Sequence, residues 1–567
     1  MAYDRDFNNV LAVWTAFNGQ MSYHTDVQHD AAFRFEVNCQ STTRCAFCIQ
    51  GDVTIDWGDG NSTSYSRPDS LYALRHTYYA YGTYTVTITG NLKNIRFMAE
   101  PTFLYGYRTY QVVSRVLTPF PPTMSVVTDF SYMFYACQKL VEVPADLFFG
   151  GEMTSSLVGY YSMAASIPEN LFRNNRKVVS FAHCFSHMRY LEEIPVGLFN
   201  GQTLAEDFSA TFAACTGYTV IPAGLFDNCP LVTDFSYTFD TAIKNTVIPA
   251  GLFYHCPLVT TFAECFAGCV KVTTIPTGLF DHCPLVESFA VCFRGYYNRS
   301  GVWYTVRMAL TSVPAGLFAN NPKVTTFEEC FRNTSITTVP EGLFDNNPEV
   351  ETFKLTFYQS YITTLPSGLF AQNTKVMYFD GCFQESHLTA VPANLLANCA
   401  GVWSFAYCFM DSQLTAIPEG LFDGNPTVYS FMQCFAGAPI ANIPAGLFAK
   451  CTVAWNFEQC FYGCKRCAVI PQGLFDHNTE ASQFRYCFSN NYASTSGSNM
   501  NSWTTVPSGL FDNCPNVYSF EGCFRYCRKI TSALPELWNT HPTARGTYCF
   551  LGCEAAENYA DVPSGWK

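Results

Sequence analysis

Apolar and turn-forming positions recur along most of this chain with a period of 26 or 27 residues. Each unit carries a version of the motif (I/V)-P-x-G-L-F. From about residue 125 onward its regular return predicts a solenoid, because one short unit cannot bury its apolar side chains alone whereas stacked neighbours can. The sixteen motif prolines are Pro144, Pro168, Pro195, Pro222, Pro249, Pro276, Pro314, Pro340, Pro366, Pro392, Pro418, Pro444, Pro471, Pro507, Pro535 and Pro563.

The unit at 222–248, PAGLFDNCPLVTDFSYTFDTAIKNTVI, shows which elements to expect. The pieces VTDF and NTVI have the β-branched content of short strands. GLFDNCP and SYTF are each long enough for about one helical turn, and Pro222 favours an extended residue before it. The predicted fold class is therefore mainly β with short helical turns.

Phenylalanine is unusually frequent, with 51 residues in the chain, and most of them are in register with the repeat. They occupy three positions of the unit, in the segments LF, T-x-F and CF. Rings at equivalent positions of stacked turns predict three continuous ladders inside the solenoid. This interpretation is favoured over an aromatic ligand-binding stripe.

Cysteine also follows the repeat, in two sets among 27 residues. One set precedes the CF phenylalanine, where Thr and Met also occur, so a small buried group is expected there. The second set shares its position with asparagine, which predicts a side chain that donates a hydrogen bond to the backbone of the turn. The first set is Cys184, Cys265, Cys292, Cys330, Cys382, Cys408, Cys434, Cys460, Cys487, Cys523 and Cys549. The second is Cys229, Cys256, Cys283, Cys399, Cys451 and Cys514, with Asn321, Asn347, Asn373, Asn425 and Asn478.

Catalytic and metal chemistry is not expected from these cysteines. The segment IPAGLFYHCPLV at 248–259 places His255 beside Cys256, but other copies replace either residue, which argues against a nucleophile and its base. The pairs Cys45–Cys48 and Cys464–Cys467 lack the second well-spaced pair of a zinc site. The repeat acids, such as Asp227, share their position with Ala and Tyr. No catalytic residue, cofactor or metal is therefore predicted.

Residues 127–148, VTDFSYMFYACQKLVEVPADLF, and 259–280, VTTFAECFAGCVKVTTIPTGLF, resemble the 26-residue bacterial surface-protein repeat of the BspA-like leucine-rich-repeat family. The resemblance covers about three quarters of the chain. It implies a leucine-rich-repeat solenoid, here of about 16 turns, that serves adhesion and protein recognition on cell surfaces. It carries no catalytic residue.

Residues 31–97 have a different pattern, in which TYTVTIT alternates with a period of two as a half-buried strand does. The motifs D-W-G-D-G at 56–60 and H-T-Y-x-x-x-G-T-Y-T-V at 76–86 resemble PKD-type domains, which are immunoglobulin-like β-sandwiches used as spacers in surface proteins. Asp56, Asp59 and Asn61 could ligate calcium, but turn formation is favoured.

Four segments follow from these patterns. Residues 1–30 form an N-terminal attachment segment, 31–97 a PKD-like β-sandwich, 98–124 a linker or solenoid cap, and 125–567 the solenoid. The attachment role of residues 1–30 rests on their position alone.

Two repeats are longer than the others, and their extra residues lie at 294–308 and 489–503, between the CF phenylalanine and the next proline. Insertions on one face of a repeat protein are often binding loops, and their Tyr, Trp, Ser, Asn and Gly content suits protein recognition. Tolerated surface decoration is the alternative. The candidate partner-binding residues are Tyr296, Tyr297, Arg299, Trp303, Tyr304, Arg307, Asn490, Asn491, Tyr492 and Trp503.

Charge and hydropathy restrict the kinds of partner that are expected for this chain. The formal net charge of −13 is spread along the chain, which argues against nucleic-acid binding. No run of 18 apolar residues occurs, and the first residues lack the pattern of a secretion signal, so neither membrane insertion nor export by the chain itself is expected.

These expectations favour a non-enzymatic adhesive protein of a phage virion, as a fibre, capsid decoration or receptor-binding protein. Its partners would be other virion proteins through residues 1–30 and a host surface protein or glycan through the solenoid. A bacterial cell-surface adhesin with an atypical export signal is the alternative, and homo-oligomer formation stays open.

Overall fold

The computed structural model describes residues 32–40, 44–97, 112–124, 140–144, 147, 166–169, 171–173, 175–299, 302–304, 306–464, 466–490 and 503–567. The chain divides into two compact units. The first comprises Met1–Ser155 and Asn170–Lys177, and the second comprises Ser156–Glu169 and Val178–Lys567. Among the described residues, no helix has the length and apolar character needed to cross a membrane.

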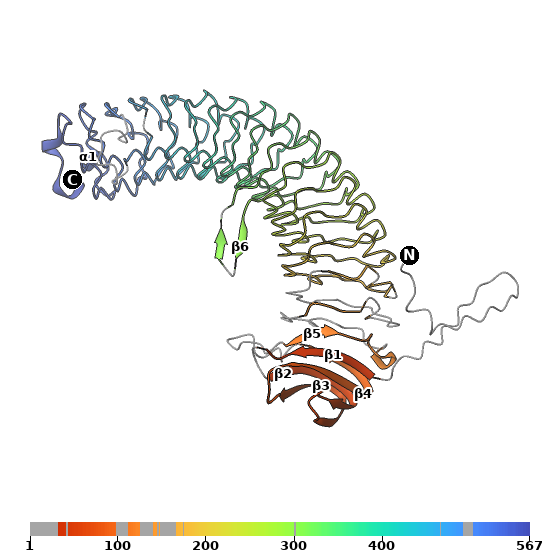
Figure 1. The fold of residues 1–567 in the computed structure, drawn as a ribbon. Helices are drawn as coiled ribbons and strands as arrows, with labels where there is room; N and C mark the ends of the chain where they lie inside the picture. The colour runs from red at the N-terminus through yellow and green to blue at the C-terminus, as the bar shows by residue number, and fades with distance from the viewer. Residues whose placement is uncertain are drawn as a thin grey trace. The chain divides into compact units, whose positions relative to one another are not determined.

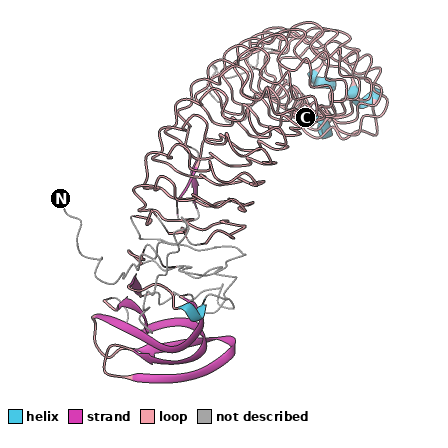
Figure 2. Cartoon of the chain, turned by 90° about the vertical axis from the view of Figure 1, so that its right-hand side faces the viewer, coloured by secondary structure: helices cyan, strands magenta, loops and turns pink. Residues whose placement is uncertain are grey.

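The first unit is built on one antiparallel sheet with the strand order β3-β2-β4-β1-β5 (Figure 2). Its rings gather on one face, where the centroids of Phe35 and Phe97 are 4.9 Å apart. The described strands form a single sheet, so the two facing sheets of the predicted sandwich are not seen among them. The strands are β1 Ala32–Asn38, β2 Arg44–Asp56, β3 Ser62–Thr77, β4 Thr83–Arg96 and β5 Val113–Val116.

Strand β5 lies within the segment 98–124 that the sequence analysis assigns to a linker or cap. It pairs with β1, and its Arg115 forms a parallel bridge to Glu142, near the first repeat proline. The β5 segment therefore does two things: it continues the sheet, and it contacts the start of the repeats.

The D-W-G-D-G segment connects β2 to β3 as a tight turn. Asp56 accepts a hydrogen bond from the backbone of Gly58, and Asp59 accepts one from the backbone of Asn61. The second oxygen of Asp59 lies 2.8 Å from His76 Nε2. Turn formation by these acids is confirmed, and within the described part of the chain no cluster of three or more His, Cys, Asp or Glu side chains is placed to hold a metal ion.

In the second unit, successive turns stack one upon another (Figure 1). The predicted strands VTDF and NTVI are reduced to single parallel bridges, such as Asp207↔Asp234↔Thr261 and Val220↔Val247. The pieces predicted as helical turns are runs of hydrogen-bonded turns instead. Residues with positive φ interrupt them, such as Gly224 at 71° and Tyr237 at 57°, and an α-helix cannot continue through this conformation.

These positive-φ residues give the solenoid its hydrogen-bonding pattern. Alternate backbone N–H groups point along the axis: Phe235 donates to Thr261, and Tyr237 donates to Ala263, at 3.2 and 2.8 Å. The N–H of Thr238, between Tyr237 and Phe239, instead closes a turn onto Phe235. Each turn is thereby tied to the next through backbone bonds that do not depend on side-chain identity.

The three predicted phenylalanine ladders are confirmed. Phe239, Phe266 and Phe293 stack at successive centroid distances of 5.6 Å, and all three are fully buried. Ladders of the LF and T-x-F positions run beside this one, as in the 6.1 Å contact of Phe226 with Phe253. The phenylalanines are therefore the core of the solenoid.

Few other regular elements occur in the described residues. The hairpin strands are β6 Tyr297–Arg299 and β7 Val302–Tyr304, the short helix α1 is Leu537–Thr540, and the 3-10 turns are η3 Pro122–Met124, η4 Tyr559–Asp561 and η5 Ser564–Trp566. After α1, His541 Nε2 lies 3.1 Å from the carbonyl oxygen of Cys514. The turns at Pro144 and Pro168 are only partly described, so the number of about 16 turns stays a prediction.

Candidate partner-binding surfaces

The asparagine–cysteine position forms a ladder in the interior, as predicted. Asn347 Nδ2 donates to the carbonyl oxygens of Phe318 and Asn321, at 3.1 and 2.9 Å. At the same position of another turn, the thiol of Cys283 lies 3.5 Å from the carbonyl oxygen of Cys256. Both residue types donate to backbone carbonyls of the preceding turn, which explains why they interchange.

The neighbouring Cys256 and His255 point to opposite sides of the backbone. Cys256 is fully buried and His255 is exposed, so the imidazole cannot take the thiol proton. Burial also raises the pKa of these thiols, that of Cys229 to about 12. A thiol that keeps its proton in the interior is not a nucleophile.

A third buried cysteine position escaped the sequence analysis. The thiol of Cys269 lies 3.3 Å from the carbonyl oxygen of Phe239, and Cys464 makes the equivalent contact with Phe435. The spacing C-F-x-x-C, as in 265–269, was the available signal. Cys464, taken in the sequence as part of a C-x-x-C pair, therefore belongs to this ladder. Its members are Cys215, Cys269, Cys464, Cys527 and Cys553.

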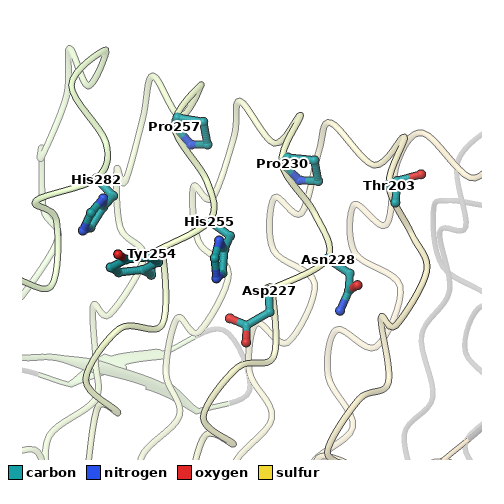
Figure 3. Close-up of a pocket in the computed structure, with 8 residues that line it drawn as sticks. All are labelled: Thr203, Asp227, Asn228, Pro230, Tyr254, His255, Pro257 and His282. Atoms are coloured by element: carbon teal, nitrogen blue, oxygen red, sulfur yellow. The ribbon is translucent and has the colours of Figure 1, made fainter.

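A shallow hollow of about 460 Å³ lies on the outside of four adjacent turns, just beyond the buried ladder (Figure 3). The ring of Tyr254 is 3.9 Å from that of His282 between centroids, and Asp227 lies in the same hollow. Asp227 is exposed, as expected for a solvated turn residue. The lining is Thr203, Asp227, Asn228, Pro230, Tyr254, His255, Pro257 and His282, which offers hydrogen bonds and ring surface but no activated nucleophile.

The insertion 294–308 stands out from the stacked turns as the β6–β7 hairpin (Figure 1). Its base is closed by backbone bonds: Gly295 donates to Arg332, and Met308 donates to Asn333, at 2.9 and 3.0 Å. A side chain at position 295 would meet the carbonyl oxygen of Asn333 at 2.2 Å, so only glycine fits there. The repeat itself therefore fixes where the hairpin begins and ends.

Tyr296 anchors the first strand of the hairpin and is only 3 % exposed. Its hydroxyl donates to Asp240 Oδ1 at 2.7 Å and to Glu264 Oε2 at 3.1 Å. The pKa of Asp240 is raised to about 7, since burial favours the neutral carboxyl and Glu264 adds negative charge, while the Tyr296 hydrogen bond acts in the opposite direction. Two acids of the preceding turns thus hold the hairpin through one hydroxyl.

Arg307 anchors the returning strand. Its guanidinium donates to the carbonyl oxygens of Thr334 and Gln359 and lies 4.0 Å from the centre of the Tyr361 ring. Three consecutive repeats therefore contribute to one clamp. Tyr296 and Arg307 hold the hairpin, and the predicted contact residues Tyr297, Arg299, Trp303 and Tyr304 lie on its strands β6 and β7.

Replacing Asp240 by Asn is expected to flatten the pH dependence of stability. The folded carboxyl keeps its proton up to about pH 7, whereas an unfolded aspartate releases it near 3.8. Folding thus binds a proton in this window, so the free energy of unfolding of the wild type falls as the pH rises from about 4 to about 7 and no longer changes through this group above it. Urea unfolding of wild type and D240N at about pH 4.5 and about pH 8 measures the difference. Equal changes in the two proteins would contradict the raised pKa.

The second insertion is described only at its ends. Asn490 is nearly buried, and its backbone donates to Arg525 at 2.9 Å. Trp503 is fully buried against Phe488, with 5.5 Å between the ring centroids. These two residues therefore hold the ends of the insertion, and the predicted contact residues Asn491 and Tyr492 lie outside the described residues.

No protein-family model matches the chain, and no curated protein is similar to it. Among solved structures, the chain is similar to one described as the Drosophila Toll–Spatzle complex, with a TM-score of 0.43 and 15% identity over 70% of this chain and 47% of that chain. A TLR13–ssRNA13 complex matches with a TM-score of 0.37 and 11% identity, over 76% of this chain and 65% of that chain. A complex of Latrophilin 3, Unc5D and FLRT2 (LRR) matches with a TM-score of 0.30 and 10% identity, over 63% and 77%. The chain spans about half the length of the Toll chain.

The repeat unit shares several features with leucine-rich repeats. Each turn contributes short parallel bridges, an inward apolar set, and an Asn or Cys side chain that donates to the backbone, as at Asn347. The second unit is a solenoid of stacked repeats. Such a solenoid is rigid along its axis and presents one surface position per turn.

Proposed function

We propose that this chain is a non-enzymatic recognition protein of a phage virion, in which the solenoid presents the β6–β7 hairpin to a host surface. The observation that carries the proposal is the hairpin clamp formed by Gly295, Tyr296 and Arg307. The repeat uses its apolar and thiol side chains in the core, so recognition falls to what departs from the repeat.

The clamp matters because binding is stronger when a loop is ordered before it meets its partner. The hairpin begins at a glycine that no other residue can replace without a clash, and it ends at an arginine bound to two carbonyl oxygens. An insertion that is merely tolerated on the surface does not need an anchored base. The anchored base therefore favours a binding role for 297–305 over tolerated surface variation.

The finer parts of the proposal rest on the resemblances in the sequence. The BspA-like repeats and the PKD-like segment support a surface-exposed adhesive protein, with residues 1–30 as the attachment to other virion proteins. A bacterial cell-surface adhesin shares the same recognition role. Mass spectrometry of purified virions distinguishes the two: the chain is expected among the virion proteins, and its presence only in bacterial envelope fractions contradicts the virion assignment.

Shortening the hairpin is expected to weaken binding to host cells at least about tenfold, because central aromatic and arginine side chains dominate most interfaces. In the variant, two glycines replace residues 297–305, and Tyr296 and Arg307 are kept so that the clamp stays closed. Flow cytometry of the labelled full-length chain on a panel of host cells measures binding.

The control for this experiment is Tyr190→Ala, which removes an exposed ring elsewhere on the second unit. It is expected to bind as the wild type does. Circular dichroism and the melting temperature verify that the shortened variant stays folded. Unchanged cell binding by a folded, shortened variant contradicts the recognition role of the hairpin.

A further inference from the structure

A second departure from the repeat lies on the outer surface of four successive turns. Aromatic side chains occupy this surface at Tyr378, Trp403, Tyr429 and Trp455, which we call the aromatic column. Trp403 and Trp455 are each 42 % exposed. The ring of Tyr378 contacts that of Trp403 edge to face at 5.7 Å, and Tyr429 and Trp455 are nearly parallel at 6.3 Å.

In other turns the position of Trp403, Tyr429 and Trp455 is variable, with Glu, Met and Ser among its residues, and in some turns it is threonine. Thr233 and Thr260 donate their hydroxyl hydrogens to carbonyl oxygens of the preceding turn, at 3.1 and 3.0 Å. An indole ring at this position makes no such hydrogen bond to the preceding turn. A large exposed ring also lowers the solubility of the protein. The fold thus requires no aromatic residue at this variable position, yet three adjacent turns carry one.

The aromatic column is rigid. The backbone of Trp403 donates to Met377, that of Tyr429 donates to Trp403, and that of Trp455 donates to Tyr429, at 2.8 to 3.1 Å. These bonds fix the spacing of the backbone that carries the rings before any ligand arrives, so little backbone conformational entropy is lost on binding. A row of rings at the period of the solenoid suits a ligand that is itself linear and repeating.

The charges around the aromatic column restrict the kind of ligand that it can bind. The segments 401–407, 427–432 and 453–456, which carry Trp403, Tyr429 and Trp455, contain no charged residue. Charged pairs stand at the two ends of the column: Lys354 pairs with Asp380 at 3.8 Å and lies over the ring of Tyr378, and Arg485 pairs with Glu458 at 3.6 Å. A neutral aromatic surface between neutralised charges complements an uncharged ligand and selects against an anionic or cationic one.

We propose that the aromatic column binds a neutral linear polysaccharide, whose sugar rings stack their C–H faces on the exposed aromatic rings. The electron-rich face of an aromatic ring attracts the weakly positive C–H groups of a pyranose. A protein partner fits less well, because a stable protein interface needs roughly 800 Å² from each side, whereas the column consists of four side chains. The inference rests on the proposed recognition function and names its ligand class at a second surface.

Affinity electrophoresis of the full chain in native gels tests the proposal. The neutral probes are galactomannan, xyloglucan and mixed-linkage β-glucan, and the charged probes are polygalacturonate and heparin. At least one neutral polymer is expected to retard the wild type, whereas the charged polymers leave its mobility unchanged. Each of W403A and W455A is expected to weaken retardation about tenfold, since one ring contact is removed. W403F keeps an aromatic face and is expected to retain part of the binding.

The matched controls are Tyr254→Ala, which removes a 53 % exposed ring from the hollow, and Thr233→Ala at the equivalent position of an earlier turn. Both are expected to bind as the wild type does. The proposal is overturned if no neutral polymer retards the chain, if charged polymers bind equally, or if the two tryptophan variants bind unchanged. Loss of cell binding in the shortened hairpin variant with polysaccharide binding retained separates this inference from the proposed function. The two measurements therefore show separately whether polysaccharide binding by the aromatic column or cell recognition by the hairpin fails.

Discussion

Phe353→Ala is expected to destabilise the solenoid by roughly 3–5 kcal/mol, the range for removing a buried phenylalanine ring. Phe353 is fully buried and lies 5.8 Å from Phe327 and 5.6 Å from Phe379 in its own ladder. It also contacts Phe344 and Phe370 of the adjacent ladder, at 4.8 and 4.7 Å. The cavity would therefore remove contacts from three consecutive turns at once.

The loss should also change how the solenoid unfolds. Each turn contacts only its neighbours, so a weak turn in the middle separates the array into two halves that unfold independently. Urea denaturation followed by circular dichroism is expected to show a single transition in the wild type and two in F353A. Val196→Ala, at a 73 % exposed position, serves as the control and is expected to change stability by less than about 0.5 kcal/mol. Full wild-type stability in F353A would show that the ladders are not the core.

Asn347→Asp is expected to cost roughly 3–5 kcal/mol at neutral pH, because an ionised carboxylate would be buried against two carbonyl oxygens. Asn347 is fully buried, and its amide donates to Phe318 and Asn321. An ionised carboxylate can only accept hydrogen bonds, so both carbonyls would face negative charge.

The chain supplies the matched control for this substitution, because cysteine occupies the same ladder at Cys283 and Cys451. Asn347→Cys keeps a weak donor and is expected to cost only about 1 kcal/mol. A buried carboxyl has a raised pKa, so the penalty in N347D should shrink as the pH falls toward the ordinary range of aspartate. Urea unfolding of N347D and N347C at about pH 5 and about pH 8 measures both effects. Equal stability of the two variants at the higher pH would contradict the donor role of this position.

The positions of the two insertions could be predicted from the sequence, but the different roles of their residues could not. Their length and composition marked 294–308 and 489–503 as departures from the repeat, but all ten candidate residues were treated alike. The structure separates the residues that hold the insertions from the strand residues of the β6–β7 hairpin. The holding residues are Tyr296, Arg307, Asn490 and Trp503. The distinction depends on the acids of earlier turns, Asp240 and Glu264, which lie more than thirty residues away from Tyr296 along the chain.

The aromatic column shows the same limit. Trp403 and Trp455 are visible in the sequence, yet a tryptophan in an apolar repeat is as easily a core residue as a surface residue. Only the position of the neighbouring backbone bonds shows that these rings lie outside and on adjacent turns. The predicted helical turns failed for a related reason, since ordinary residues such as Tyr237 adopt positive φ without a glycine to announce it.

The sequence by itself determined the repeat, the identity of the buried positions and the donor role of the Asn–Cys ladder. These are properties of a period: a side chain that recurs at each turn must meet its own copies, whatever the detailed path of the backbone. The tertiary structure alone decided the backbone conformation of each turn, the single sheet of the first unit, the hairpin clamp and the outward row of aromatic rings. Those features depend on φ values and on contacts between residues that are not equivalent by the repeat, and neither is encoded in spacing.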